Sequence, residues 1–263
     1  MAAVGLYAWR VEPHWLEFSY PIMPVRGLAP HLEGATLAQI SDIHVGPQVD
    51  DEYLIESFRR LNEIAPDFVA YTGDWVTYDG PREMQQLRGV LKHAAHGKIA
   101  TVGILGNHDY GYEWHELKMA DDICKIAKDS GITMLRNQAW SAGGLQIIGI
   151  DDLWSPCFAP ENVLQRNGAD DSTIALCHNP DSADRPVWSN YRGWILAGHT
   201  HGGQCRPPFL PPPLIPVENK RYIAGEYELS GERKMYISRG VGHLERIRFN
   251  ARPEIPIFRL QRA

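Results

Sequence analysis

The sequence contains few cysteines and no closely spaced pair of them. Its 263 residues include four, at positions 124, 157, 177 and 205, and none belongs to a CxxC motif. A dense disulfide framework of the kind found in small secreted domains is therefore excluded. The spacing is typical of ordinary thiols in a reducing compartment, and it leaves two disulfides open as an alternative.

Long hydrophobic runs are also absent. The N-terminal run covers only residues 2–9 and has no basic segment before it, whereas a helix that spans a membrane needs about 20 apolar residues. The same features argue against a signal peptide. We therefore expect a soluble or cytoplasmic chain as given, with a longer natural precursor that carries an anchor or export signal as the alternative.

Positive charge is not in excess. Lys and Arg total 26 against 32 Asp and Glu, which gives a formal net charge of -6. This balance argues against a specific nucleic-acid partner, because a sequence-independent grip on nucleic acid needs a basic surface. No internal repeat, charge block or long linker divides the chain, so we expect a single domain over residues 1–263.

Strand-like and helix-like segments alternate in the first half of the chain, and strands dominate after residue 140. Apolar periodicity predicts helices over 50–65, 83–94 and 113–131, and a shorter one over 160–168. In the helix over 113–131, Trp114, Leu117, Ile123 and Ala127 are expected on one side. Apolar runs predict strands within 36–41, 67–74, 98–109, 145–152, 172–178, 193–199, 234–240 and 255–260. This pattern favours an α/β (α+β) fold in which helices lie outside two sheets.

Five of the predicted strands end in Asp, Asn or His. The carboxyl ends of strands in open α/β sheets form ligand sites, so these side chains are expected to converge. Any one of them could be a turn residue, but buried polar groups at one shared edge need a common partner. The converging residues are Asp42, His44, Asp74, Asn107, His108, His178, His199 and His201.

The donor set indicates metal ions. Imidazole nitrogen and hard oxygen without thiolate suit Mn, Fe, Zn or Co. Six or seven ligands are too many for one tetrahedral zinc and fit two ions that share a bridging carboxylate. Two such ions can hold the attacking and the departing oxygens of a phosphoryl displacement. The other six histidines lack this setting and are expected to be surface or packing residues.

These motifs resemble the five-part signature of the calcineurin-like metallophosphoesterases. They occur in the family's order and span residues 42–201, and they read Asp42-Ile43-His44, Gly73-Asp74, Gly106-Asn107-His108-Asp109, His178 and Gly198-His199-Thr200-His201. The string "GHTHGGQ" at 198–204 and the opening "LYAWRVEPHWLE" further resemble the YkuE- and YaeI-like bacterial phosphodiesterase branch of that family.

The resemblance implies a four-layer αββα sandwich of two mixed sheets flanked by helices, with a centre of two divalent or trivalent transition-metal ions. Mn is expected, with Fe, Zn or Co as alternatives. One ion would take Asp42, His44 and His201, and the other Asn107, His178 and His199. Asp74 would bridge them, a hydroxide between the ions would be the nucleophile, and His108 would be the general acid.

The orientation of His108 is the point where the sequence departs from the family. Many relatives carry a carboxylate three residues after the aspartate of the Gly-Asp motif, and Thr77 stands there instead. Asp79 and Asp109 are nearby candidates to orient the imidazole, and Asp109 is included among the catalytic residues. Thr77 also makes the purple acid phosphatase subclass, which has an iron-binding tyrosine at this place, a poor match.

The expected function is a phosphodiesterase that acts on a small-molecule phosphoester. The alternatives are a phosphomonoesterase, a sugar-nucleotide or lipid pyrophosphatase on the same metal core, and a catalytically silent metal-binding scaffold. Residues 205–216 hold six prolines and predict a stiff, extended loop close to His201. Its apolar side chains could hold part of a substrate or bring the chain near a membrane surface, unless they simply pack on the sandwich.

Overall fold

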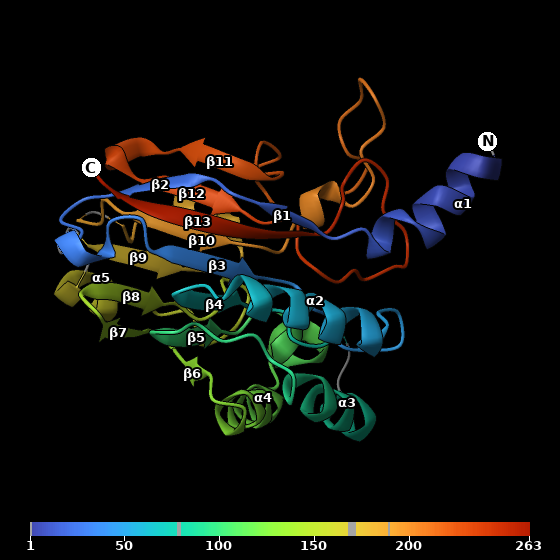
Figure 1. Ribbon diagram of the computed structural model, residues 1–263, viewed down its shortest axis with the longest axis horizontal. Helices are drawn as coiled ribbons and strands as arrows, with labels where there is room; N and C mark the ends of the chain where they lie inside the picture. Colours follow the sequence, from blue (N-terminus) through green and yellow to red (C-terminus); the bar gives the residue numbers. More distant parts are fainter. Residues whose placement is uncertain (1, 78–79, 168–171, 189) are drawn as a thin grey trace.

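The computed structural model describes residues 2–77, 80–167, 172–188 and 190–263. Two mixed β-sheets form its centre (Figure 1). The first has the order β1-β13-β3-β4-β5-β6, and β2 also pairs with β13. Its strands are β1 (Glu17–Ser19), β2 (Ile22–Val25), β3 (Thr36–Ile40), β4 (Phe68–Thr72), β5 (Ala100–Ile104), β6 (Thr133–Met134) and β13 (Glu254–Arg262).

The second sheet has the order β11-β12-β10-β9-β8-β7. It consists of β7 (Gln138–Ala142), β8 (Leu145–Gly149), β9 (Thr173–Leu176), β10 (Trp194–Ala197), β11 (Gly225–Glu228) and β12 (Lys234–Ile237). β8, β9, β10 and β12 are parallel, and β7 and β11 are antiparallel edges. In the first sheet β3, β4 and β5 are parallel and β13 runs antiparallel to β3. All strands that precede the predicted ligands are therefore parallel within their sheet.

Three apolar clusters define four layers. Successive residues of a strand face opposite sides of its sheet, so Phe68 of β4 packs between the two sheets while Val69 packs under the helices. The inner cluster joins Leu37 and Phe68 of the first sheet to Ile174 and Leu196 of the second. Ile195 faces a third cluster on the outer side of the second sheet. The fold is therefore the predicted αββα sandwich.

Helices cover the outer faces of both sheets. The first sheet packs against α2 (Asp51–Ile64), α3 (Pro81–Leu91) and α4 (Leu117–Asp129), and the second against α5 (Glu161–Asn167). α2 and α3 match the sequence prediction within three residues at each end. α4 begins four residues later than predicted, because Glu113 and Trp114 have left-handed backbone. Trp114 therefore lies outside the helix, and Leu117 is exposed rather than packed.

Two segments project from the end of the sandwich where β3, β4 and β10 finish. They are α1 (Ala2–Arg10) and the proline-rich loop 205–216, drawn in orange (Figure 1). Residues 205–216 contain no helix or strand, as expected of a loop, and the chain turns at Pro208 and Phe209, where Phe209 has a positive φ. All four cysteines are free thiols. Among the described residues, none of the helices combines the length and apolar character that crossing a membrane requires.

Candidate metal centre

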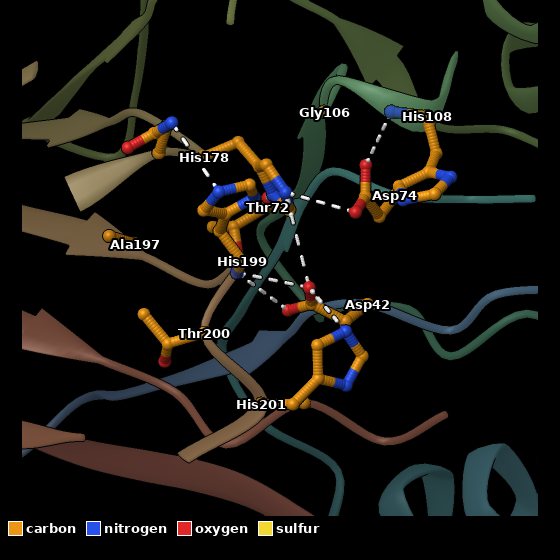
Figure 2. A network of polar contacts seen from close by, with 12 residues as sticks. Asp42, Thr72, Asp74, Gly106, His108, His178, Ala197, His199, Thr200 and His201 are labelled. Atoms are coloured by element: carbon orange, nitrogen blue, oxygen red, sulfur yellow. Dashed lines mark hydrogen bonds and ion pairs between the residues drawn. The ribbon is translucent and has the colours of Figure 1, made fainter. Parts of the chain in front are cut away.

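The predicted ligands meet at the carboxyl ends of five strands that belong to both sheets (Figure 2). β3, β4 and β5 of the first sheet lead into the segments that carry the first four ligands, and β9 and β10 of the second sheet lead into those that carry the last three. All seven side chains are buried, namely Asp42, His44, Asp74, Asn107, His178, His199 and His201. Because parallel strands end at one edge of a sheet, two packed sheets bring both sets of ligands into one site.

Six of these residues form two separate groups. Asp42, His44 and His201 are one group, and Asp74, His178 and His199 are the other. Within each group the potential ligand atoms lie within 4.8 Å of one another. The first group consists of the residues predicted for one metal position, and the second combines His178 and His199 of the other position with Asp74, the predicted bridge. Two His/Asp clusters of this kind fit a binuclear metal site.

Asp74 lies between the two groups. Its Oδ2 atom is 3.1 Å from Nε2 of His178 in its own group and 3.4 Å from Nε2 of His44 in the other. Its Oδ1 atom accepts a hydrogen bond from the backbone N–H of His108 at 3.0 Å. One carboxylate oxygen therefore lies beside a histidine of each group.

Asn107 provides a test of whether the residues fit a metal. Its side chain is 1% exposed, and among the described residues its Oδ1 atom has no hydrogen-bond partner. An unpaired buried oxygen is costly, and a cation would satisfy it. The two His/Asp groups offer nitrogen and oxygen donors without thiolate, which suits a transition metal of the Mn, Fe, Zn or Co type. The residues present therefore fit the implied ions.

Backbone carbonyls hold two of the imidazoles in place. Nδ1 of His178 donates to the carbonyl of Thr72 at 2.7 Å, and Nε2 of His199 donates to the carbonyl of Pro216 at 2.8 Å. Each bond fixes which ring nitrogen carries the proton and leaves the other free as a donor atom for a metal. Asp42 accepts from the backbone N–H of His199 at 3.0 Å, which ties the two groups together (Figure 2).

The backbone around the centre is strained. Positive φ values occur at five of the seven ligand positions, namely Asp42, His44, Asp74, His199 and His201. Residues other than glycine adopt this region rarely, and such positions cost of order 1–3 kcal/mol each. The backbone is also closely packed at Gly106, where an added Cβ would lie 2.5 Å from the amide nitrogen of Asp74. Strain and close packing together indicate that the loops are fixed in the conformation that brings their potential metal ligands together.

Burial and charge decide the protonation of the imidazoles. Burial lowers the pKa of His44 and of His201 well below the usual value, so both rings are neutral at neutral pH and ready to bind a metal. Burial opposes charge on His178 as well, but the carboxylates of Asp74 and Asp42 raise its pKa well above the usual value. Without a metal, His178 therefore carries the positive charge that the two carboxylates require.

His108 is half-buried beside the two groups. Its Nδ1 atom donates to the backbone carbonyl of Thr77 at 3.0 Å. Its ring meets the ring of His44 edge-on with centroids 5.0 Å apart, and on another side it meets Trp114 at 4.9 Å. The main-chain carbonyl of Thr77 thus accepts the hydrogen bond from His108 that the family resemblance assigns to a carboxylate at this position. Asp79, the other candidate for this role, lies outside the described residues.

Asp109 is placed under the backbone of the Asp74 loop. In the described part of the chain its hydrogen bonds come from four backbone N–H groups, those of Asp74 at 3.0 Å, Trp75 at 2.8 Å, Val76 at 3.4 Å and Gly106 at 2.7 Å. Burial raises the pKa of Asp109, whereas the four donors favour its ionised form, because a protonated carboxyl would leave its own hydrogen without an acceptor. The carboxylate therefore holds the loop that carries Asp74.

Two features of the site have no signal in the sequence. Arg248 is fully buried, and its guanidinium donates to the carbonyls of Ala251 and Arg239 at 2.8 Å and lies 3.5 Å from Nδ1 of His201. Trp154 meets the ring of His199 edge-on at 4.7 Å and stacks near Trp114 at 6.2 Å. A lone arginine and two separate tryptophans follow no spacing pattern, so only the fold brings them to the metal centre.

Comparison with known proteins supports the same interpretation. The family model described as calcineurin-like phosphoesterase matches residues 35–203, more than half of the chain. The phosphodiesterase YaeI of Escherichia coli (strain K12) is 34% identical, over 84% of this chain and 80% of its own length. The uncharacterized metallophosphoesterase YkuE of Bacillus subtilis (strain 168) is 34% identical, over 97% of this chain and 89% of its own.

A third relative is more distant. The UDP-2,3-diacylglucosamine pyrophosphatase LpxG of Chlamydia trachomatis is 25% identical, over 87% of this chain and 84% of its own length. The matched region 35–203 contains all seven ligand positions and His108. The chain therefore belongs to the calcineurin-like phosphoesterase family, whose members are metal-dependent phosphoric ester hydrolases.

Proposed function

We propose that this chain is a phosphodiesterase whose seven buried ligands hold two metal ions, with His108 as the general acid. The observation that carries the proposal is the position of the Asp74 carboxylate between His44 and His178. Asp42, His44 and His201 would hold one ion, and Asn107, His178 and His199 the other. Because the ligands come from both sheets, we also infer that residues 1–263 act as one domain.

The bound ions would supply Lewis-acid activation of water and charge neutralisation on the phosphoryl oxygens. Manganese is the proposed metal, with iron, zinc or cobalt as alternatives, since the donor set is imidazole, carboxylate and carboxamide. The protein contributes neutral imidazoles at His44 and His201, because burial lowers the pKa of both. It also contributes a carboxylate at Asp74 that is already aligned by the amide of His108.

His108 would donate a proton to the departing oxygen. The carbonyl of Thr77 holds the hydrogen on Nδ1, so the proton that leaves must come from Nε2. The side chain is only half-buried, which leaves it accessible to the leaving group of a bound diester. After the transfer the ring is neutral and keeps its bond to Thr77. We assign Asp109 the role of positioning Asp74 through the backbone, since its contacts are backbone amides.

Hydrolysis of bis-p-nitrophenyl phosphate tests the proposal. The protein should be stripped with EDTA, dialysed, and assayed with and without Mn(II). We expect metal-dependent release of p-nitrophenolate, together with binding of two metal ions per chain in a titration of the stripped protein. Two bound ions without hydrolysis of any diester would support the silent-scaffold alternative instead. Faster hydrolysis of p-nitrophenyl phosphate than of the diester would favour a monoesterase.

A second candidate is hydrolysis of the pyrophosphate bond of a lipid-linked sugar nucleotide. The similarity to LpxG, which extends over 87% of this chain, favours it. Both reactions use the same metal core, because a pyrophosphate diester presents the same non-bridging oxygens and a departing phosphate. Measuring the release of UMP from a UDP-sugar that carries acyl chains, beside the simple diester, separates the two candidates.

A further inference from the structure

Exposed apolar side chains occur on and next to the two segments that project from the sandwich, at the end that carries the metal centre. Phe209 at the tip of the loop 205–216 is fully exposed, and Leu214 is 79% exposed. On and after α1, Leu6 is 59% and Trp15 is 50% exposed. We call the whole set the docking surface, and it comprises Val4, Leu6, Trp9, Val11, Trp15, Phe209, Leu210, Leu214 and Ile247. Exposed large apolar side chains in this number beside one functional site are a candidate interaction surface.

Direct contacts join these segments into one surface. The backbone N–H of Arg248 donates to the carbonyl of Ala8 in α1 at 2.9 Å, and that of Arg206 donates to the carbonyl of Phe249 at 2.8 Å. Tyr7 of α1 and Pro208 of the loop line the same pocket of about 480 Å³. Figure 1 shows α1 and the orange loop at the same end of the molecule. The two segments are therefore joined at their bases, and the pocket between them is lined mainly by polar and charged residues, among them Glu17 and Arg252.

The docking surface is also attached to the metal centre. The carbonyl of Pro216, the last residue of the loop, accepts the hydrogen bond from His199. Arg248, which follows Ile247, lies beside His201. The base of the loop and the residue after Ile247 therefore adjoin one histidine of each ligand group. Pro216 and Arg248 thus connect the segments of the docking surface to histidines of the metal centre.

The loop is stiff rather than collapsed. Ile215 is buried at its base, and Lys220 donates to the carbonyl of Ile215 at 2.9 Å. An added Cβ on Gly203 would meet Pro212 at 2.5 Å, which shows how closely the rising part of the loop packs on the motif. The six prolines reduce the number of backbone conformations that the loop can adopt when it is unfolded. A preorganised loop loses little conformational freedom on docking, so its exposed side chains are available for a partner.

The composition of the docking surface points to a lipid interface. The guanidinium of Arg10 lies 4.0 Å above the ring of Trp9, and that of Arg252 lies 4.2 Å above Trp15. Tryptophan, arginine and aliphatic side chains in this mixture are typical of protein segments at the boundary between headgroups and acyl chains. The apolar residues project outward on two protrusions and do not line a groove. A fluid surface that closes around each protrusion fits them better than a folded partner.

We propose that the docking surface binds an anionic phospholipid bilayer and presents the metal centre to phosphoesters of amphiphilic molecules in that bilayer. Arg10 and Arg252, the second of which also lies 3.9 Å from the carboxylate of Glu17, supply the attraction to anionic headgroups, and the apolar tips enter the boundary with the acyl chains. The protein lies on the bilayer in this arrangement and does not cross it. The substrate class rests on the proposed phosphodiesterase function, whereas the binding to a bilayer does not.

Flotation with vesicles tests the binding. The full chain loaded with Mn(II) is mixed with vesicles of phosphatidylcholine, with or without phosphatidylglycerol. We expect flotation with the anionic vesicles, and roughly a tenfold or greater loss in the triple variant Phe209→Ser/Leu210→Ser/Leu214→Ser and in Val4→Ser/Leu6→Ser/Trp9→Ser. The matched control is Ile64→Ser/Ile99→Ser, which removes two exposed apolar side chains at the opposite end of the strands. The control should float like the wild type.

Two substrates separate docking from chemistry. The loop variant should hydrolyse soluble bis-p-nitrophenyl phosphate within about twofold of the wild type, and hexadecyl p-nitrophenyl phosphate in the same vesicles at least about tenfold more slowly. Equal flotation of the wild type and both triple variants would overturn the proposal. A change of oligomeric state in the variants without any flotation of the wild type would overturn it in favour of a second copy of the chain. Flotation without hydrolysis of either substrate would overturn the phosphodiesterase function and leave the bilayer surface intact.

Discussion

The backbone amide of His108 donates to Oδ1 of Asp74 at 3.0 Å, so the proposed acid and the proposed bridging ligand are joined through the main chain. The imidazole itself makes a different bond, to the carbonyl of Thr77. Removing the side chain of His108 therefore leaves the alignment of Asp74 intact. The two residues can be tested separately, because one contributes a proton and the other a metal ligand.

Replacement of His108 by Ala should slow hydrolysis according to the leaving group. We expect a loss on the order of 10²–10⁴ for alkyl diesters, which need a proton on the departing oxygen, and a much smaller loss for p-nitrophenyl esters. The metal content should stay at the wild-type value. Equal losses on both substrates would mean that His108 binds the phosphate in the ground and transition states alike, and loss of an ion would make it a ligand.

Replacement of Asp74 by Ala should affect both metal positions, whereas Asp42→Ala should affect one. Asp74 lies 3.1 Å from His178 and 3.4 Å from His44, whereas the Asp42 carboxylate lies 3.4 Å from His201 of its own group and only 3.9 Å from the ring of His178 in the other. We expect Asp74→Ala to lose both ions and all activity, and Asp42→Ala to retain one ion. Elemental analysis of the purified variants measures this directly. Metal content in Asp74→Ala equal to that of the wild type would contradict the bridging assignment.

Gly106 should tolerate no side chain. An added Cβ would lie 2.5 Å from the amide of Asp74 and would overlap its carboxylate. Gly106→Ala should therefore lose about 1–3 kcal/mol of unfolding free energy and bind its metals more weakly. Gly89 in α3 is the matched control, because nothing lies within 4 Å of its added Cβ. Gly89→Ala should raise the unfolding free energy by roughly 0.5–1 kcal/mol.

The free energy of unfolding should decrease as the pH is lowered, because of His243. Burial, aided by the charge of Arg248, lowers its pKa to about 4, although the carbonyl of Gln48 accepts from its Nε2 at 2.9 Å. Smaller effects of the same sign come from His14 and Arg246. In the unfolded chain the His243 ring is therefore protonated near pH 6.5, whereas in the folded chain it is protonated only near pH 4. The contribution of neutral His243 to the free energy of unfolding is fully present above pH 6.5. It is lost progressively as the pH falls to 4, by roughly 3 kcal/mol.

Denaturant unfolding in EDTA at a series of pH values checks this expectation. His243→Gln keeps a donor for the carbonyl of Gln48 and removes the titrating ring, so its stability should depend less on pH over this range. His93→Gln alters an exposed histidine and should follow the wild type. If the curves of His243→Gln and the wild type stay parallel from pH 7 to pH 4, His243 does not contribute.

The fold was predictable where the chain repeats a simple period. β3, β4, β5, β9 and β10 are apolar runs, and α2 shows a clear helical stripe, so their positions follow from sequence patterns. The edge strands β7 and β11 consist of exposed and half-exposed residues, and they carry no comparable apolar run. The late start of α4 depends on the left-handed backbone of Glu113 and Trp114, which no propensity of those residues indicates.

The site was predictable as a set of residue types at strand ends, and less so as a network. The two groups of ligands follow the motif order, whereas the acceptor for His108 is a main-chain carbonyl, which any residue at position 77 would provide. Sequence comparison can show that a carboxylate is absent there. It cannot show that the backbone replaces it, because backbone geometry depends on the whole Asp74 loop and on the four amides that Asp109 holds.

The left-handed backbone at five ligand positions restricts the chemistry that this centre can acquire during evolution. A new ligand must bind metal and also accept that conformation, and asparagine, aspartate and histidine are the donor residues that do so most readily. Glutamate carries the same carboxylate and cysteine a softer donor, but neither has that tolerance. Changes of metal preference in this lineage should therefore arise by exchanges within that small alphabet, or by residues that surround the ligands, rather than by recruiting new donor types.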